Sequence, residues 1–347
     1  MPLHLQFGTE DLLRCRFALS PLCETHEAVR TLRRTERHSY HLPWLRRTRS
    51  AAAELDLAPL WLLMPTPGGY TPDFLGPPPP GTAGAATRAA TGPEGTFAEE
   101  LARVRATDPA LAREELARSL ACTPGAAGSA RGRAMLADPA RAVAELAELT
   151  ERAWRTLLAP DWPRLRDLLE ADIAYRARQL TAAGLERLFT DLHPGLSWHG
   201  KEGRLTVRTR HRLRQTQELS GRGVLLMPSV FVWPDVVSGF AAPWQPTVLY
   251  PARGAGALWQ RPTPDSARAL ARLLGANRAA VLSGLDEPAS TTALAARLGL
   301  APSSVSAHLG ALREAGLLTS RRVRRQVLYE RTPLGIAVLA GGGQSAR

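Results

Sequence analysis

Four arginines stand within five positions near the carboxyl end of the chain, as Arg321, Arg322, Arg324 and Arg325. Guanidinium groups at this spacing repel one another unless an anion lies alongside them. A nucleic-acid phosphate backbone suits such a cluster, because contacts to phosphate set affinity and register without reading a base sequence. The alternative is a charged loop that is simply solvated. We predict that these four side chains contact phosphate.

A second group of side chains, directly upstream, is small and mostly carries hydroxyl groups. Its members are Ser303, Ser304, Ser306 and Ala307. They would share the exposed face of a helix, because Val305, Leu309 and Leu312 recur at the spacing of a buried stripe. Small residues allow a helix to approach base edges closely, so we predict that this group reads bases. His308, at the edge of the stripe, and Arg313 are expected to contact phosphate.

Two helices and a hairpin are needed to position these groups. The first helix is predicted to begin after a cap at Ser290 or Thr291 and to end at Gly299, which suits a left-handed backbone. The second helix covers residues 302–315 and starts on a proline that tolerates its missing N–H group. The pattern then becomes extended over residues 319–330. This order is typical of a winged helix-turn-helix, in which one helix enters the DNA major groove.

The segment contains a motif made of four runs. They are Val305-Ser306-Ala307-His308-Leu309, Leu312-Arg313-Glu314-Ala315-Gly316-Leu317, Val327-Leu328-Tyr329 and Thr332-Pro333. With this motif, about the last 80 residues resemble the DNA-binding domain of the arsenical-resistance-repressor (ArsR-type) family of bacterial regulators. The resemblance implies a winged helix, a homodimer and, in many members, a repressor released by a ligand.

The segment departs from that family at two places. Ala301 precedes the proline of the second helix, where family members usually have Ser or Thr, so a helix cap is lost. The first helix lacks the cysteines that metal-sensing members place there. The family's thiolate metal site is therefore not carried over.

Charge is concentrated in the same segment. The chain of 347 residues has a formal net charge of +12, and residues 268–347 hold eleven arginines against four acidic residues, a net charge of +7. The clustering favours an anionic partner, and we predict double-stranded DNA. The abundance of arginine alone means little, because Lys201 is the only lysine and the composition is typical of a GC-rich genome.

Cysteine usage and hydropathy indicate the compartment. The three cysteines, Cys15, Cys23 and Cys122, form no CxxC pair, and the chain shows no charged-then-apolar leader. We therefore expect a cytoplasmic protein. The longest apolar candidate, residues 223–233, is interrupted by Pro228 and falls short of the roughly 18 residues of a membrane span. We expect no membrane partner.

The usual catalytic motifs are missing from the sequence. There is no GxSxG nucleophile elbow, P-loop or GxGxxG fingerprint, and His26-Glu27 begins a zinc-protease pattern that fails at Arg30. We expect no enzyme activity, no cofactor and no metal. Two alternatives stay open. Cys15, Cys23 and His26 could form a metal or redox site rather than lie in the core. A set of tryptophans could line a ligand pocket rather than pack a core: Trp198, Trp233, Trp244 and Trp259.

The predicted fold class is α+β. A mostly helical N-terminal region with a small antiparallel sheet, residues 1–262, precedes a C-terminal winged helix-turn-helix, residues 266–340. Helical patterns cover residues 9–19, 21–32 and 97–192, and strand patterns cover residues 3–7, 204–210, 223–233 and 247–251. The Gly/Pro-rich residues 81–96 are expected to form a flexible linker. The upstream region also resembles an uncharacterised N-terminal region of regulators from GC-rich bacteria, notably in PDFLGPPP and LLMPSVFVWP.

We predict from these observations a sequence-specific, DNA-binding transcription regulator. A homodimer is expected because a single recognition helix contacts few bases, and twofold pairs read two half-sites. The resemblance favours a repressor, controlled through residues 1–262 by an unidentified small-molecule effector. Two alternatives come from other classes. One is a sequence-independent DNA-coating protein, and the other is an enzyme whose winged helix mediates protein contacts.

Overall fold

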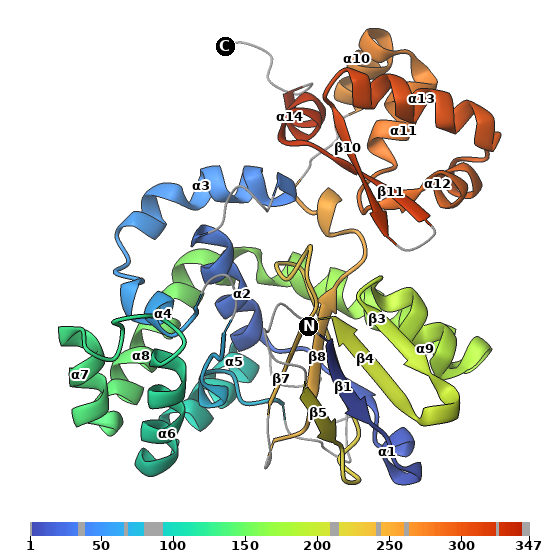
Figure 1. Ribbon diagram of the computed structural model, residues 1–347. Coiled ribbons are helices and arrows are strands. Elements are labelled where there is room, and N and C mark those ends of the chain that lie inside the picture. Colours follow the sequence, from blue (N-terminus) through green and yellow to red (C-terminus); the bar gives the residue numbers. More distant parts are fainter. Residues whose placement is uncertain are drawn as a thin grey trace. The chain divides into compact units, whose positions relative to one another are not determined.

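The chain folds into two compact units in a computed structural model that describes residues 2–33, 39–65, 69–79, 93–208, 215–240, 244–259, 264–323 and 326–341 (Figure 1). Unit 1 comprises Met1–Arg33 and Thr48–Ala252, and unit 2 comprises Arg34–Arg47 and Arg253–Arg347. The sequence pattern did not predict that residues 34–47 would group with the carboxyl-terminal residues. Among the described helices, none has the length and apolar character that a membrane crossing requires.

The helices of unit 1 follow the predicted helical patterns in most places. They are α1 (Thr9–Leu13), α2 (Pro21–Arg33), α4 (Ala58–Leu62), α5 (Pro93–Arg105), α6 (Pro109–Leu120), α7 (Ala130–Ala137), α8 (Pro139–Ala153) and α9 (Trp162–Leu192). Further along the chain from α2, α3 (Leu42–Ala53) begins in unit 2 and ends in unit 1. Gly184 interrupts α9 with a φ of 74°, a backbone conformation that glycine adopts without strain.

Two boundaries in unit 1 differ from the predictions. The helix predicted over residues 9–19 ends at Leu13, and strand β2 (Arg16–Phe17) follows, because these residues pair with the remote Leu225 and Leu226. The linker predicted over residues 81–96 extends too far toward the carboxyl end, because helix α5 already begins at Pro93. Residues 81–92 of that linker lie outside the described part of the chain.

The α+β class is confirmed, but the small antiparallel sheet that we predicted is wrong in its detail. The described part of unit 1 contains two four-stranded sheets, with strand orders β3-β4-β1-β5 and β2-β6-β8-β7. The strands are β1 (Pro2–Gln6), β3 (Leu196–His199), β4 (Arg204–Arg208), β5 (Gln215–Glu218), β6 (Leu225–Ser229), β7 (Val237–Gly239) and β8 (Thr247–Pro251). β1 is parallel to β5, and β6 is parallel to both β2 and β8. Hydrophobic alternation cannot reveal such partners, because parallel strands are joined by long crossovers.

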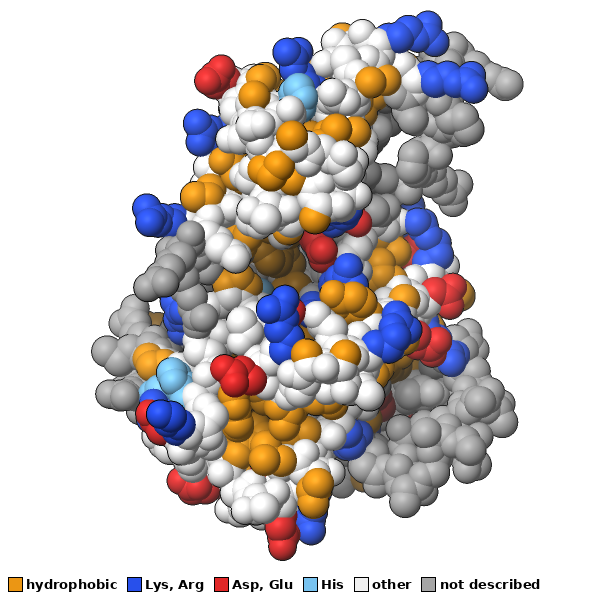
Figure 2. All heavy atoms as spheres, turned by 90° about the vertical axis from the view of Figure 1, so that its right-hand side faces the viewer, with side chains coloured by type: hydrophobic (Ala, Val, Ile, Leu, Met, Phe, Trp, Pro, Cys, Tyr) orange, Lys and Arg blue, Asp and Glu red, His pale blue; other side chains and the backbone are white. Residues whose placement is uncertain are grey.

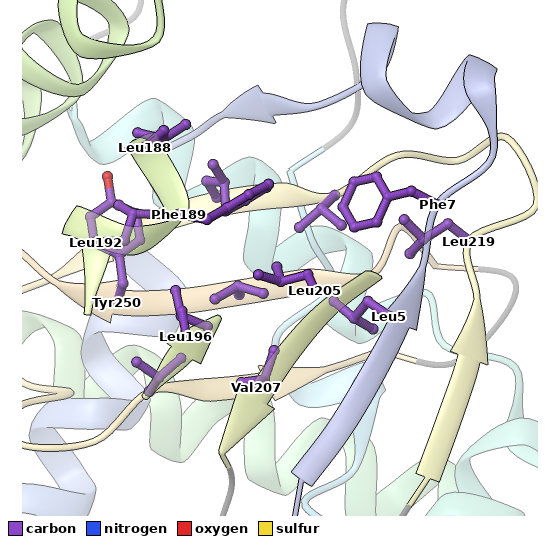
Figure 3. Close-up of a cluster of buried hydrophobic side chains, with 14 residues drawn as sticks. Leu5, Phe7, Leu188, Phe189, Leu192, Leu196, Leu205, Val207, Leu219 and Tyr250 are labelled. Atoms are coloured by element: carbon purple, nitrogen blue, oxygen red, sulfur yellow. The ribbon is translucent and has the colours of Figure 1, made fainter. Parts of the chain in front are cut away.

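The core of unit 1 lies between its sheets and the end of α9. Leu5 of β1 stands opposite Leu205 of β4, and both side chains are fully buried, as the predicted alternation requires. Figure 3 shows Phe189 and Leu192 of α9 gathered with these side chains and with Tyr250 of the other sheet. This shared core joins the two sheets into one unit.

Unit 2 combines helices with a three-stranded sheet of order β10-β11-β9. Its elements after residue 253 are α10 (Pro264–Leu274), α11 (Ala276–Ser283), β9 (Ala289–Ser290), α12 (Thr291–Leu298), α13 (Pro302–Glu314), β10 (Leu318–Val323), β11 (Gln326–Arg331) and α14 (Pro333–Gly341). The core is formed by apolar side chains of α11, α12 and α13, among them Val281, Leu294 and Leu309, which are fully buried. Figure 1 shows the β10–β11 hairpin directly following α13 in the chain.

Candidate nucleic-acid interface

The first helix of the pair, α12, begins and ends at the predicted residues. The Ser290 hydroxyl accepts a hydrogen bond from the backbone N–H of Ala293 over 3.2 Å and so caps the helix start. Gly299 follows the last helical residue with a φ of 65°, which confirms the left-handed end. These two residues fix the length of α12 and the direction in which the chain enters the turn.

The second helix, α13, presents the predicted group of small residues to solvent. Val305, Leu309 and Leu312 are at most 2 % exposed, which confirms the buried stripe. The opposite face is exposed at all four positions predicted to read bases: Ser303, Ser304, Ser306 and Ala307. The structure therefore brings these four residues together on one accessible surface. Ala301 occupies the cap position of α13 without a side-chain hydrogen bond, as its methyl group dictates.

The residues predicted to contact phosphate are distributed over α13 and the hairpin. His308 is half-buried and Arg313 is exposed, both on α13. Arg321 and Arg322 lie within β10, where their backbone partners are Leu328 and Val327, and the Arg322 side chain is exposed. Arg324 and Arg325, which complete the predicted cluster, lie outside the described residues. Figure 2 shows Lys and Arg side chains around the margin of unit 2, at the top of that view.

A buried arginine at the end of the hairpin is a residue that sequence reasoning missed. Arg331 is 1 % exposed, and its guanidinium donates hydrogen bonds to the carbonyl oxygens of Leu282 and Ser283 at the end of α11. Burial lowers the pKa of Arg331 to about 10, so the side chain stays protonated at neutral pH. The sequence around Arg331 does not indicate a structural role for this residue, because arginine is common throughout the chain.

Acidic residues neutralise one arginine of α12. Arg297 lies 3.1 Å from a carboxylate oxygen of Asp286 and 3.5 Å from one of Glu287, and all three side chains are about one-third exposed. Arg253 lies 3.9 Å from Glu287 in the same network. These carboxylates hold Arg297 beside the loop before β9. Arg297 is thus engaged within unit 2, whereas Arg313 and Arg322 stand on its exposed surface.

The two alternative sites of the sequence analysis concern histidine, cysteine and tryptophan side chains. The described residues contain no group of three or more His, Cys, Asp or Glu side chains placed to hold a metal ion. Burial lowers the pKa of His26 to about 3, and its Nε2 lies 3.3 Å from the hydroxyl of Thr150. Trp198 packs on Phe7 in the core of unit 1, whereas Trp259 belongs to unit 2. Core packing accounts for Trp198.

Comparison with known families covers most of the chain in two parts. Residues 84–256 match a family of unknown function (DUF5937), which agrees with the predicted resemblance to an uncharacterised N-terminal region. Residues 273–321 match a helix-turn-helix domain. No curated protein and no solved structure matches the chain. The helix-turn-helix match includes all of α12 and α13. The chain is a helix-turn-helix, DNA-binding transcription regulator whose exposed α13 face lies within the matched domain.

Proposed function

We propose that the protein binds operator DNA as a homodimer through a winged helix-turn-helix of the ArsR type and represses transcription. An effector bound by unit 1 would release the DNA. The single observation that carries the DNA-binding part is the two-sided character of α13. One face anchors the helix by burying Val305, Leu309 and Leu312, and the opposite face exposes side chains small enough to approach base edges.

The hairpin supplies the phosphate-binding part of the proposal. Arg322 is exposed on β10, and Arg324 and Arg325 follow β10 in the sequence. In a winged helix such a ribbon lies beside the flanking backbone while the recognition helix enters the major groove. Contacts of this kind would provide most of the affinity, and the serines of α13 would provide the discrimination between sequences.

A candidate dimer surface lies on α10 and α14. These two helices contact each other, and they expose Leu273 and Leu334, with exposed fractions of 74 % and 54 %. Two large apolar side chains on touching helices favour burial against a second copy. We expect Leu273→Glu combined with Leu334→Glu to shift the protein to monomer in analytical ultracentrifugation. Leu13→Glu, a change at an exposed leucine of unit 1, is the matched control and should leave the mass unchanged.

The proposal assigns effector sensing, and no reaction, to unit 1. A regulator of bacterial transcription shares its compartment with the chromosome, so we place the protein in the cytoplasm. The deciding experiment is a genome-wide pull-down of DNA fragments bound by the purified protein at physiological salt. A few sharp peaks that share a twofold-symmetric motif would support the proposal, particularly with one peak near the protein's own gene.

A second candidate function is sequence-independent coating of DNA. The exposed face of α13 offers serine and alanine at its amino-terminal end, instead of the Arg, Asn or Gln side chains that make bidentate contacts to bases. Broad coverage of the genome without a shared motif in the pull-down would favour this function and reject operator recognition.

A further inference from the structure

Residues 39–47, near the amino end of the chain, belong to the unit that contains the helix-turn-helix. Within this segment Tyr40 is 5 % exposed and Trp44 is fully buried. The segment forms the 3-10 helix Ser39–His41 and the first turns of α3, and the 3-10 helix contacts α14. A piece of chain remote in sequence therefore packs against α14 of unit 2.

Trp259 anchors this segment. Its indole N–H donates a hydrogen bond to Nδ1 of His41 over 2.9 Å. Its ring centroid lies 6.2 Å from that of Trp44, and the Arg47 guanidinium carbon lies 5.6 Å from its centroid. The hydrogen bond fixes His41 as an acceptor at Nδ1, and the ring contacts hold α3 along its first turns. Trp259 thus contacts three residues of one short segment.

Tyr40 connects the segment to the end of the hairpin. Its hydroxyl oxygen accepts a hydrogen bond from the backbone N–H of Arg331, the last residue of β11, over 3.3 Å. The ring lies close to Gly256, where a Cβ atom would stand 2.7 Å from Cδ1 of Tyr40 and 2.0 Å from the carbonyl oxygen of Asp286. Glycine is required for this approach. Tyr40 therefore packs closely against Gly256 and is hydrogen-bonded to β11.

We propose that residues 39–47 form a latch, in which Tyr40 positions the base of the β10–β11 hairpin through the hydrogen bond that it accepts from Arg331. The inference rests on the proposed function. The contacts of Trp259 with His41, Trp44 and Arg47 hold the latch in place.

The test addresses the position of the hairpin, with the full chain and a short fluorescent DNA duplex of random sequence at low salt. Tyr40→Phe keeps the ring and removes the acceptor of the Arg331 N–H. We expect a threefold to tenfold loss of affinity, about the worth of one hydrogen bond, together with a shallower dependence of affinity on salt. Tyr70→Phe is the matched control in unit 1, since the Tyr70 hydroxyl bonds to Asp73, and it should keep wild-type binding. Wild-type affinity and salt dependence in Tyr40→Phe would overturn the positioning role.

Fluorescence anisotropy separates the two ways in which this experiment can fail. A chain that does not bind the duplex contradicts the proposed function. A wild-type chain that binds the duplex no more tightly than Tyr40→Phe contradicts the latch.

Discussion

The Nε atom of Arg331 donates a hydrogen bond to the carbonyl oxygen of Leu282 over 2.9 Å and thereby joins the end of β11 to the end of α11. The last carbonyl groups of a helix have no partner within the helix, and a buried cation satisfies them while it interacts favourably with the helix dipole. The Arg331 side chain therefore joins the end of the hairpin to the helical core of unit 2.

Replacing Arg331 tests that attachment. Arg331→Lys keeps the positive charge but loses the fork that reaches both Leu282 and Ser283. We expect the free energy of unfolding of unit 2 to fall by about 1–3 kcal/mol, measured by urea unfolding of the full chain. Arg313→Lys, at an exposed position of α13, is the control and should change stability by less than about 0.5 kcal/mol. Equal stability of the two variants would show that the charge alone matters.

The exposed arginine of the hairpin leads to a prediction about salt. Arg322→Ala should weaken binding to every DNA sequence alike and reduce the slope of log K against log salt by about 0.9 if one phosphate contact is lost. The same measurement applies to Arg324→Ala and Arg325→Ala. Arg141→Ala removes an exposed arginine that pairs with Glu145 in α8 and serves as the control. An unchanged slope in Arg322→Ala would remove this residue from the interface.

For the serines of α13 we expect an effect on sequence discrimination and no effect on the dependence of affinity on salt. Ser304→Ala or Ser306→Ala should reduce the ratio of specific to non-specific affinity and leave the salt slope unchanged, because base contacts carry sequence information and phosphate contacts do not. The ratio is measured by competition between an operator fragment from the pull-down and a random duplex. A uniform loss of affinity for both would show that these serines only position the helix.

The two helices of the pair differ in their caps, and this difference predicts two changes of opposite sign. Ser290→Ala removes the hydroxyl that accepts the Ala293 N–H and should destabilise unit 2 by about 1 kcal/mol. Ala301→Ser places a hydroxyl at a cap position whose backbone is already extended, with φ −64° and ψ 137°, and should stabilise unit 2 by about 0.5–1 kcal/mol. Thermal unfolding of both variants checks the signs. A loss of stability in Ala301→Ser would show that the cap of α13 is shaped by other contacts.

The helix-turn-helix was predictable from the sequence because its determinants are local. A hydroxyl at residue 290, a glycine at residue 299 and a repeating leucine stripe each specify their own element, and the structure has all three. The pairing of β2 with β6 and the packing of Tyr40 in unit 2 were not predictable. Both depend on contacts between residues far apart in the chain, which leave no periodic signal.

The candidate interface was also predictable only in its local features. The four small residues of α13 were placed correctly on one exposed face, since helical spacing alone determines it. The long-range contacts within unit 2 were missed. Arg331 binds carbonyl oxygens of α11, and Trp259 binds His41, through pairs separated by 49 and 218 residues. Neither residue type is unusual in this chain, so only the folded structure could identify these contacts.

The buried carboxyl group of Glu24 predicts how the stability of unit 1 depends on pH. Glu24 is 2 % exposed, one of its oxygens accepts the backbone N–H of Val230 over 3.1 Å, and burial raises its pKa from 4.5 to about 8. The folded state therefore holds a proton between these two pH values that the unfolded state releases, so Glu24 lowers stability as pH rises through this range. Glu24→Gln resembles the protonated form and should escape this loss.

We expect the stability of Glu24→Gln relative to wild type to increase from pH 5 to pH 8.5 by at least about 1 kcal/mol, since each unit of pKa shift corresponds to about 1.4 kcal/mol. Urea unfolding at both pH values gives the difference. His26, whose pKa is lowered to about 3, reduces stability as pH falls below 6.5 in both proteins, so its effect cancels in the comparison. Glu99→Gln, at an exposed position of α5, is the control. A relative stability that does not change with pH would show that Glu24 is already ionised in the folded protein.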